Sequence, residues 1–128
     1  MQDTEDPLFK QEGYDLMGAA FEVYREKGHG FLEAVYQECM ECELTSRQIP
    51  FQSKPRLQIF YKGEPLVQDY EADLLVCTGI VTELKAAKML APEHEAQLIN
   101  YLRATGKRVG YLINFGSHPQ LEWKRMVL

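Results

Sequence analysis

Long hydrophobic runs are missing from this sequence, and so are the marks of several common protein classes. None of its apolar stretches approaches the roughly 20 residues that a membrane-spanning helix needs, so we expect no membrane span. The opening MQDTEDPLFK is acidic and has no apolar segment, so we do not expect a secretory signal. Internal repeats, a glycine-rich phosphate loop and a Ser-His-Asp arrangement are also lacking, which argues against repeat proteins, phosphate-loop NTPases and serine hydrolases.

Cysteine is scarce, and its number is odd. Three cysteines argue against a disulfide framework and favour a reducing compartment, so we predict a cytoplasmic protein. Cys39 and Cys42 form a C-x-x-C pattern within a stretch with helical periodicity. Because no second pair accompanies it, buried or half-buried thiols are favoured over a zinc or redox site.

Positive charge is scarce in the first part of the chain. Residues 1–50 carry eleven acidic and four basic residues, whereas residues 51–128 carry eight acidic and ten basic ones. The overall charge of −5 argues against nucleic-acid binding, but this distribution allows a positive face beside an acidic flank. A mixed solvated surface explains the same numbers.

The chain has the length and composition of one globular domain. Its 128 residues and 45% hydrophobic content predict a single domain over residues 1–128, with residues 1–7 frayed. Apolar periodicity predicts helices over 8–27, 31–47 and 92–106, and strands over 56–62, 66–76, 80–86, 109–115 and 121–128. The order ααβββαβ(β) indicates an α/β fold with helices packed on a mixed β-sheet. The first three strands form an antiparallel meander, and the crossover helix makes the third and fourth strands parallel or non-adjacent. We expect Ile99 and Leu102 of that helix in the core.

Three charged residues interrupt two apolar strands in the segment 70–88. Asp73, Glu83 and Lys85 lie where strand interiors favour apolar side chains, and buried charges are costly unless they are paired or hold a metal. Glu83 and Lys85 share a face because side chains two apart on a strand project to the same side.

The loop between these strands decides whether Asp73 joins them. A three-residue loop at 77–79 that ends with a left-handed glycine pairs Val76 with Ile80 and puts Asp73 opposite Glu83. A two-residue loop would put the two carboxylates on opposite faces.

Two interpretations of this cluster remain open. Two facing carboxylates stay ionised only with a cation between them, and hard oxygen ligands suit Mg²⁺ or Mn²⁺. Lys85 would then stabilise charge on a phosphate or orient an attacking water. Alternatively, Glu83 and Lys85 form an ion pair at a sheet edge while Asp73 is solvated.

Other polar residues also have two interpretations. Glu33, in the first turn of a helix, either interacts favourably with the helix dipole or points at a site on the sheet. Gln97 and Tyr101 share one stripe of the third helix and are either surface residues or part of a site. The three histidines, His29, His94 and His118, have no evident partner, and we expect them at the surface.

Several motifs occur together in an order that resembles a known family. The stretch GFLEAVY over 30–36 fits G-x-x-E-x-x-Y and is followed by YKGE, ADLLV, VTELK, QLINYL and LINFG. This pattern resembles the GxxExxY family of the PD-(D/E)XK nuclease-like superfamily over nearly the whole chain. The resemblance implies a restriction-endonuclease-like core, with a mixed sheet flanked by helices.

The resemblance also implies site residues. Asp73 corresponds to the first strand acid of the superfamily, Glu83 and Lys85 to its (D/E)-x-K, Glu33 to an acid from an early helix, and Gln97 to a polar residue on the helix after the motif strand. Asp73, Glu83, the backbone carbonyl of Leu84 and, if the helix brings it close, Glu33 would bind Mg²⁺ or Mn²⁺. Tyr36 and Tyr101 match family positions without an assigned role. Ala72 replaces the proline that gives the superfamily part of its name.

The resemblance implies a metal-dependent nuclease, with DNA favoured over RNA as substrate. Its rival is a catalytically silent nuclease-like module that binds nucleic acid or a protein partner, because fold alone does not settle function. A domain of this size offers little surface for gripping a duplex, so a homodimer or a protein partner would supply more.

Overall fold

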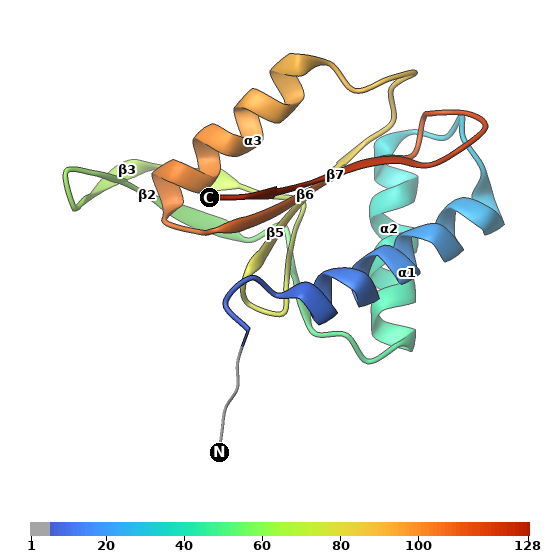
Figure 1. Cartoon of the computed structure of the whole chain (residues 1–128), viewed down its shortest axis with the longest axis horizontal. Coiled ribbons are helices and arrows are strands. Elements are labelled where there is room, and N and C mark those ends of the chain that lie inside the picture. Colours follow the sequence, from blue (N-terminus) through green and yellow to red (C-terminus); the bar gives the residue numbers. More distant parts are fainter. Residues whose placement is uncertain (1–5) are drawn as a thin grey trace.

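The chain folds into a mixed sheet with helices on both sides (Figure 1). The structure is a computed structural model and describes residues 6–128. The helices are α1 (Lys10–Lys27), α2 (Glu33–Ser46) and α3 (Pro92–Thr105). The strands are β1 (Phe51–Ser53), β2 (Arg56–Tyr61), β3 (Glu64–Glu71), β4 (Leu74–Val76), β5 (Ile80–Lys85), β6 (Val109–Asn114) and β7 (Glu122–Val127).

Five strands form the main sheet in the order β1-β4-β5-β6-β7. β5 and β6 are parallel neighbours joined through α3, as the crossover predicted, and the other pairs in this sheet are antiparallel. The six residues of β6 are all buried because helices cover both faces of this strand.

The helices divide between the two faces of the sheet (Figure 1). α1 and α2 pack on one face over a large apolar core that includes the fully buried Leu16, Met40 and Leu44. α3 packs on the other face over a smaller core that includes Leu98 and Leu102. Leu102 is thus buried as expected, whereas Leu98 takes the place expected of Ile99, which is half-buried.

The expected strand over 66–76 is in fact two strands in two different sheets. β3 pairs with β2 in a separate two-stranded sheet, while β4 pairs with β1 and β5, so the expected three-stranded meander is wrong. The chain bends at Ala72 and Asp73, where Ala72 N–H donates to Pro55 and the Asp73 carbonyl accepts from the Lys54 N–H. These long-range bonds divide a stretch that its strand-like pattern alone predicts to be one strand. The short β1 was not predicted from the sequence.

The loop of residues 77–79 has the expected length but a different conformation. Cys77 and Thr78 have positive φ, at 53° and 62°, and the left-handed position expected of Gly79 is therefore wrong. Gly79 is needed for space instead, because a Cβ there would overlap the ring of Phe9.

The start of the described chain is held by hydrogen bonds. The Asp6 carboxylate accepts from the backbone N–H groups of Leu8 and Lys10, at 3.0 and 3.1 Å. The fraying expected over residues 1–7 stays a prediction, and residues 1–5 lie outside the described residues.

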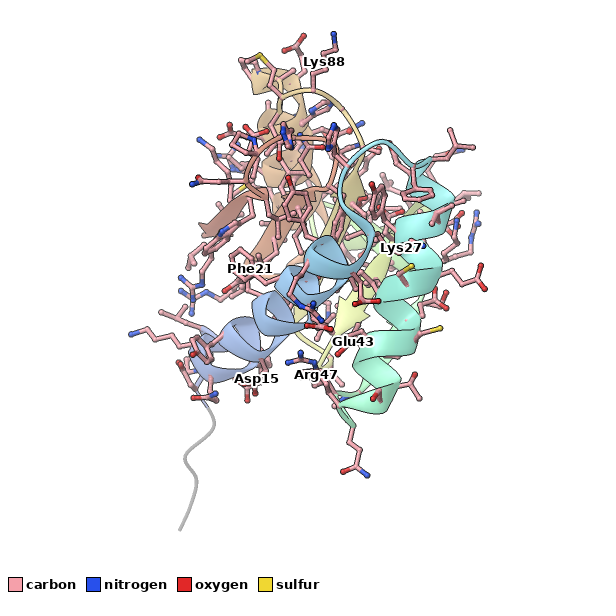
Figure 2. All side chains as sticks on the ribbon, turned by 90° about the vertical axis from the view of Figure 1, so that its right-hand side faces the viewer. Asp15, Phe21, Lys27, Glu43, Arg47 and Lys88 are labelled. Carbon is pink, nitrogen blue, oxygen red and sulfur yellow. The ribbon has the colours of Figure 1, made fainter. Side chains whose placement is uncertain are left out.

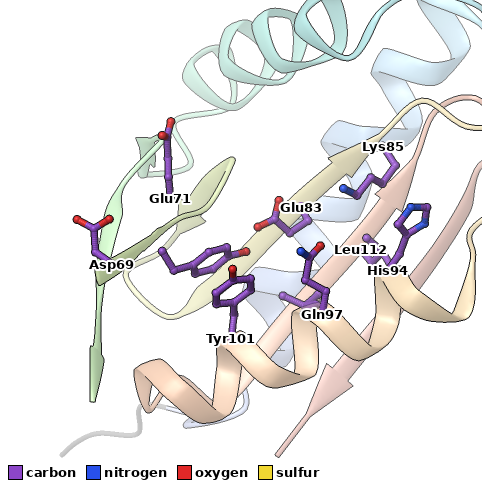
Figure 3. A pocket seen from close by; sticks show the side chains of 10 residues that line it. Asp69, Glu71, Glu83, Lys85, His94, Gln97, Tyr101 and Leu112 are labelled. Carbon is purple, nitrogen blue, oxygen red and sulfur yellow. The ribbon is translucent and has the colours of Figure 1, made fainter. Parts of the chain in front are cut away.

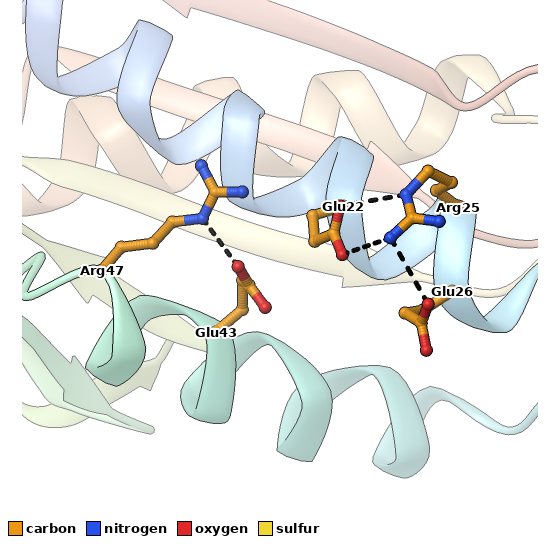
Figure 4. Close-up of polar contacts among 5 residues, drawn as sticks. All are labelled: Glu22, Arg25, Glu26, Glu43 and Arg47. Carbon is orange, nitrogen blue, oxygen red and sulfur yellow. Dashed lines mark hydrogen bonds and ion pairs between the residues drawn. The ribbon is translucent and has the colours of Figure 1, made fainter.

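The outer surface of the α1–α2 pair carries short ion pairs between residues close in sequence. Figure 2 shows Glu43 and Arg47 at the end of α2 beside α1. Figure 4 shows two separate groups of ion pairs: Arg47 binds Glu43 at 2.7 Å, and on α1 Arg25 binds both Glu22 and Glu26. Pairs this exposed contribute little to stability.

In the same pair of helices Cys39 is half-buried and Cys42 exposed, both as free thiols. No helix in the described part of the chain has the length and apolar character to span a membrane.

Candidate active site

The β4–β5 hairpin brings two acidic residues opposite each other. Val76 pairs with Ile80 and Leu74 with Thr82, as the three-residue loop predicted. One step further along this register, Asp73 lies across from Glu83. The register that the loop predicted is therefore confirmed for the paired strand residues, whereas Asp73 lies at the bend before β4 and lines a different cavity from Glu83.

Asp73 is fixed in place from three sides. Its carboxylate accepts a hydrogen bond of 2.7 Å from the backbone N–H of Leu84, which has no partner on β4 because that strand begins at Leu74. Its carbonyl accepts from the Lys54 N–H at 3.0 Å and from the Gln37 side chain at 2.9 Å. Burial raises the pKa of Asp73, against the lowering effects of the Leu84 N–H, Lys85 and Lys54.

The carbonyl of Leu84 points to the same side as its N–H. On a β-strand the two backbone groups of one residue face the same edge, so this oxygen is directed toward Asp73. The Leu84 side chain is buried in the core on the α1–α2 side. Only the backbone of Leu84 is therefore directed at the candidate site.

Glu83 is half-buried and has no partner. Within residues 6–128 its carboxylate forms neither a hydrogen bond nor an ion pair, so the simple Glu83–Lys85 ion pair is not formed. Burial raises the pKa of Glu83 to about 7, the positive charge of Lys85 opposes the rise, and Glu33 adds to it. A cation bound beside a half-buried, unpartnered carboxylate stabilises its ionised form.

Lys85 and Gln97 line the same pocket as Glu83. The pocket lies between β3, β5 and α3 and has a volume of about 260 Å³ (Figure 3). The amide of Gln97 projects from α3 toward Glu83 in this view. Tyr101 lies one turn further along α3 and lines the pocket as well.

Glu33 and Asp73 line a second, smaller cavity. This cavity of about 100 Å³ is also bounded by Gln37, Lys54 and Leu84 and does not include Glu83. Glu33 is the first residue of α2 and is exposed, and its charge still acts on Glu83. The expected site residues thus line two cavities: Glu83, Lys85 and Gln97 line the first, and Glu33 and Asp73 line the second.

Tyr36 positions the helix that carries Glu33. Its hydroxyl donates to the Gly28 carbonyl at 2.6 Å and accepts from the Phe31 N–H at 3.2 Å, and its ring stacks on Phe115. Gly30, with φ of 110°, permits the turn that Tyr36 closes. The outer residues of the G-x-x-E-x-x-Y pattern therefore build the start of α2, and the central glutamate is presented by it.

Sequence reasoning missed a residue that fixes the exit of β5. Asn114 is fully buried and is the register partner of Lys85 on β6. Its amide exchanges two hydrogen bonds of 2.9 Å with the backbone of Ala87 and donates to Glu122 at 3.0 Å. The only signal for Asn114 was a polar residue within the apolar run of β6.

His94 was expected at the surface but is half-buried and lines the pocket. Its Nδ1 accepts a hydrogen bond of 3.1 Å from the Ala91 N–H, which caps the start of α3. A histidine three residues after the start of a helix is a weak signal for such a cap. His29 and His118 are exposed as expected, and their ring centres lie 4.4 Å apart with the planes tilted by 31°.

The rim of the pocket is acidic, and one arginine offsets part of its charge. Asp69 and Glu71 on β3 both bind Arg56 of β2, at 3.0 and 3.5 Å. Arg56 thereby offsets charges that would otherwise repel an anionic ligand.

The donor set fits a hard divalent cation only in part. The described residues contain no ready-made group of three His, Cys, Asp or Glu side chains around one point. The carboxylates of Asp73 and Glu83 and the Leu84 carbonyl are oxygen donors of the kind that Mg²⁺ and Mn²⁺ take, and such ions keep several waters. The unpartnered Glu83 carboxylate is the feature that fits a cation best.

Comparison with known proteins identifies the class and then the family. Searched against solved structures, 93% of the chain matches 60% of the chain in "Crystal structure of SSO0001", with 15% identity and a TM-score of 0.57, and the fold is restriction-endonuclease-like. The chain thus spans less than two thirds of that structure. The profile of the PD-(D/E)XK nuclease superfamily matches residues 10–126, and the protein belongs to this superfamily. No curated protein matches it. The narrower assignment to the GxxExxY family stays a prediction.

Proposed function

We propose that the protein is a Mg²⁺- or Mn²⁺-dependent nuclease that hydrolyses phosphodiester bonds of nucleic acid. The observation that carries this proposal is the half-buried, unpartnered carboxylate of Glu83, next to Lys85 and across from the fixed Asp73. Membership of the nuclease superfamily supports the reaction class. DNA is the favoured substrate, and RNA is the alternative that the assay below separates.

In this proposal Asp73, Glu83 and the Leu84 carbonyl hold the metal, with Glu33 as a further donor, directly or through water. A bound divalent ion supplies a water of lowered pKa and neutralises charge that develops on the phosphate. The Leu84 N–H keeps the Asp73 carboxylate in one orientation, which lowers the cost of arranging the ligands.

Lys85 and Gln97 act on the substrate side of the pocket. The Lys85 ammonium contacts the phosphate and stabilises its added charge, and the short bonds around Asn114 fix the strand end that carries it. The Gln97 amide orients the attacking water or a phosphate oxygen. Because burial raises the pKa of Glu83 to about 7, this carboxyl loses its proton when it binds a cation, so metal binding strengthens with rising pH.

The proposal is tested by a cleavage assay with linear and circular DNA, single strands and RNA, each with Mg²⁺, Mn²⁺ or EDTA. The test variant is Lys85→Ala, and the matched control is Lys10→Ala, an exposed lysine on α1 at the other face of the sheet. We expect metal-dependent cleavage by the wild-type protein and by Lys10→Ala, and its loss in Lys85→Ala.

Equal cleavage by all three proteins would assign the activity to a contaminating nuclease and refute the proposal. Folded wild-type protein that cleaves none of these substrates with either metal would favour the silent binding module instead.

A further inference from the structure

The pocket beside Glu83 contains a buried hydroxyl without a hydrogen bond. Tyr70 is 7% exposed, and its phenolic oxygen is the one buried side-chain polar atom among the described residues that has no partner. Buried polar groups in folded proteins are almost always hydrogen-bonded, and each exception calls for an explanation. A ligand that is absent from the free protein is one such explanation.

The ring of Tyr70 is held firmly although its hydroxyl is free. It stacks on Tyr101 with ring centres 3.9 Å apart and planes at 5°, and it belongs to the small core under α3 with Leu75 and Val81. Its place near the end of β3 is set by the pairing of Tyr70 with Leu57 on β2. The hydroxyl therefore cannot turn away to find water, and its position is set by packing alone.

Tyr70 lines the same pocket as Glu83, Lys85 and Gln97. Within residues 6–128 the Glu83 side chain makes no hydrogen bond, so the Tyr70 hydroxyl does not donate to that carboxylate. A phenol and an ammonium that line one pocket are both hydrogen-bond donors, and Arg56 offsets part of the Asp69 and Glu71 charge at its rim. This combination suits an oxyanion with several acceptor oxygens.

We propose that the Tyr70 hydroxyl is a phosphate-binding group that donates a hydrogen bond to a non-bridging oxygen of the substrate phosphate contacted by Lys85. The inference rests on the proposed function and adds a residue to its substrate side. Because stacking on Tyr101 already holds the ring in one position, little ordering of the donor is needed when the phosphate binds. This role could not be predicted from the sequence, since a tyrosine on an apolar strand is normally a core residue.

The test is the Tyr70→Phe variant, which removes only the hydroxyl. Because that hydroxyl has no partner in the free protein, the thermal midpoint should stay the same or rise. Cleavage turnover should fall about 10- to 100-fold, as for the loss of one hydrogen bond to a charged group. Tyr61→Phe, at an exposed tyrosine on β2, is the matched control and should change neither.

A binding measurement separates this inference from the nuclease proposal. The probe is thymidine 3′,5′-bisphosphate, titrated into each protein with Ca²⁺ present, and we expect about tenfold weaker binding by Tyr70→Phe than by wild type. Weaker binding by Tyr70→Phe in a protein that cleaves nothing would support the phosphate site and refute the nuclease.

Cleavage and binding equal to wild type in Tyr70→Phe would overturn the inference and leave the nuclease standing. A clear drop in its thermal midpoint would also overturn it, because the hydroxyl would then have a partner in the free protein. No bisphosphate binding and no cleavage by wild type would refute both.

Discussion

The two sides of the main sheet differ in how some of their polar groups are bonded. On the α1–α2 side the buried Tyr36 hydroxyl makes two hydrogen bonds, and the hydroxyl of the half-buried Tyr24 donates to the Ser117 carbonyl at 2.7 Å. On the α3 face the buried Tyr70 hydroxyl and the half-buried Glu83 carboxylate have no partner within residues 6–128.

This contrast separates what stabilises the fold from what is open to ligands. Satisfied polar groups and a large apolar core on the α1–α2 side provide stability. Unsatisfied groups on the α3 side lower stability in the free protein, and a cation and a phosphate would recover it. The four predictions below test this division from the largest expected effect to the smallest.

Asp73→Asn should disable the candidate active site without unfolding the protein. The asparagine side chain keeps an oxygen that can accept from the Leu84 N–H but loses the negative charge for a cation. We expect metal-dependent cleavage to fall on the order of 10³-fold, with the far-ultraviolet circular dichroism unchanged. Cleavage within a few-fold of wild type would show that Asp73 does not hold the metal.

Leu44→Ala should damage the α1–α2 side and leave the site intact. Leu44 is fully buried, and its truncation leaves a cavity that should cost about 2–5 kcal/mol of the free energy of unfolding, measured by urea denaturation. Below the unfolding transition, cleavage per folded molecule should match wild type. A large loss of activity in folded Leu44→Ala would contradict the separation of the two faces.

Glu83→Gln should stabilise the metal-free protein in a pH-dependent way. The pKa of Glu83 is raised from 4.5 to about 7, so the folded state favours the protonated form. The stability from this group is complete below pH 4.5 and is lost as the pH rises through 7. Glutamine resembles the protonated form, so at pH 8 the variant should gain up to about 3 kcal/mol over wild type, and at pH 4 almost nothing.

The measurement for Glu83→Gln is urea denaturation with EDTA at both pH values. Glu93→Gln, at an exposed glutamate of α3, is the control and should show no such dependence. Equal stability of Glu83→Gln and wild type at pH 8 would show that ionised Glu83 does not destabilise the folded protein.

Tyr36→Phe should give the smallest effect. The variant leaves the Gly28 carbonyl and the Phe31 N–H without their partner, which should cost about 1–2 kcal/mol of stability. This loss contrasts with Tyr70→Phe, for which none is expected. Thermal denaturation of both variants side by side checks the difference, and an equal drop in both would remove the contrast between the two faces.

Local rules of the sequence were enough for the hairpin that carries the site. The spacing between Asp73 and Glu83 and a three-residue loop predicted the register, and the structure confirms it for the pairs from Leu74 to Val76. The period of two placed Glu83 and Lys85 in one pocket for the same reason. The parallel pairing of β5 and β6 followed from the crossover helix.

Contacts between distant segments were beyond the same rules. The bend at Asp73 depends on hydrogen bonds from Lys54 and Gln37, and neither partner can be identified from the apolar pattern of residues 66–76. The stacking of Tyr70 on Tyr101, which fixes the free hydroxyl, joins β3 to α3 and is likewise invisible in either segment alone.

The central claim is that the α3 side of the sheet binds a divalent cation through Glu83, and calorimetric titration with Mn²⁺ at pH 6.5 tests it most directly. Wild-type protein should bind Mn²⁺ and release a proton, seen as a heat that depends on the ionisation enthalpy of the buffer, because Glu83 is mostly protonated at this pH. Glu83→Gln should bind at least tenfold more weakly and release no proton. Absence of binding by wild type at millimolar Mn²⁺, or equal binding by the two proteins, would contradict the account.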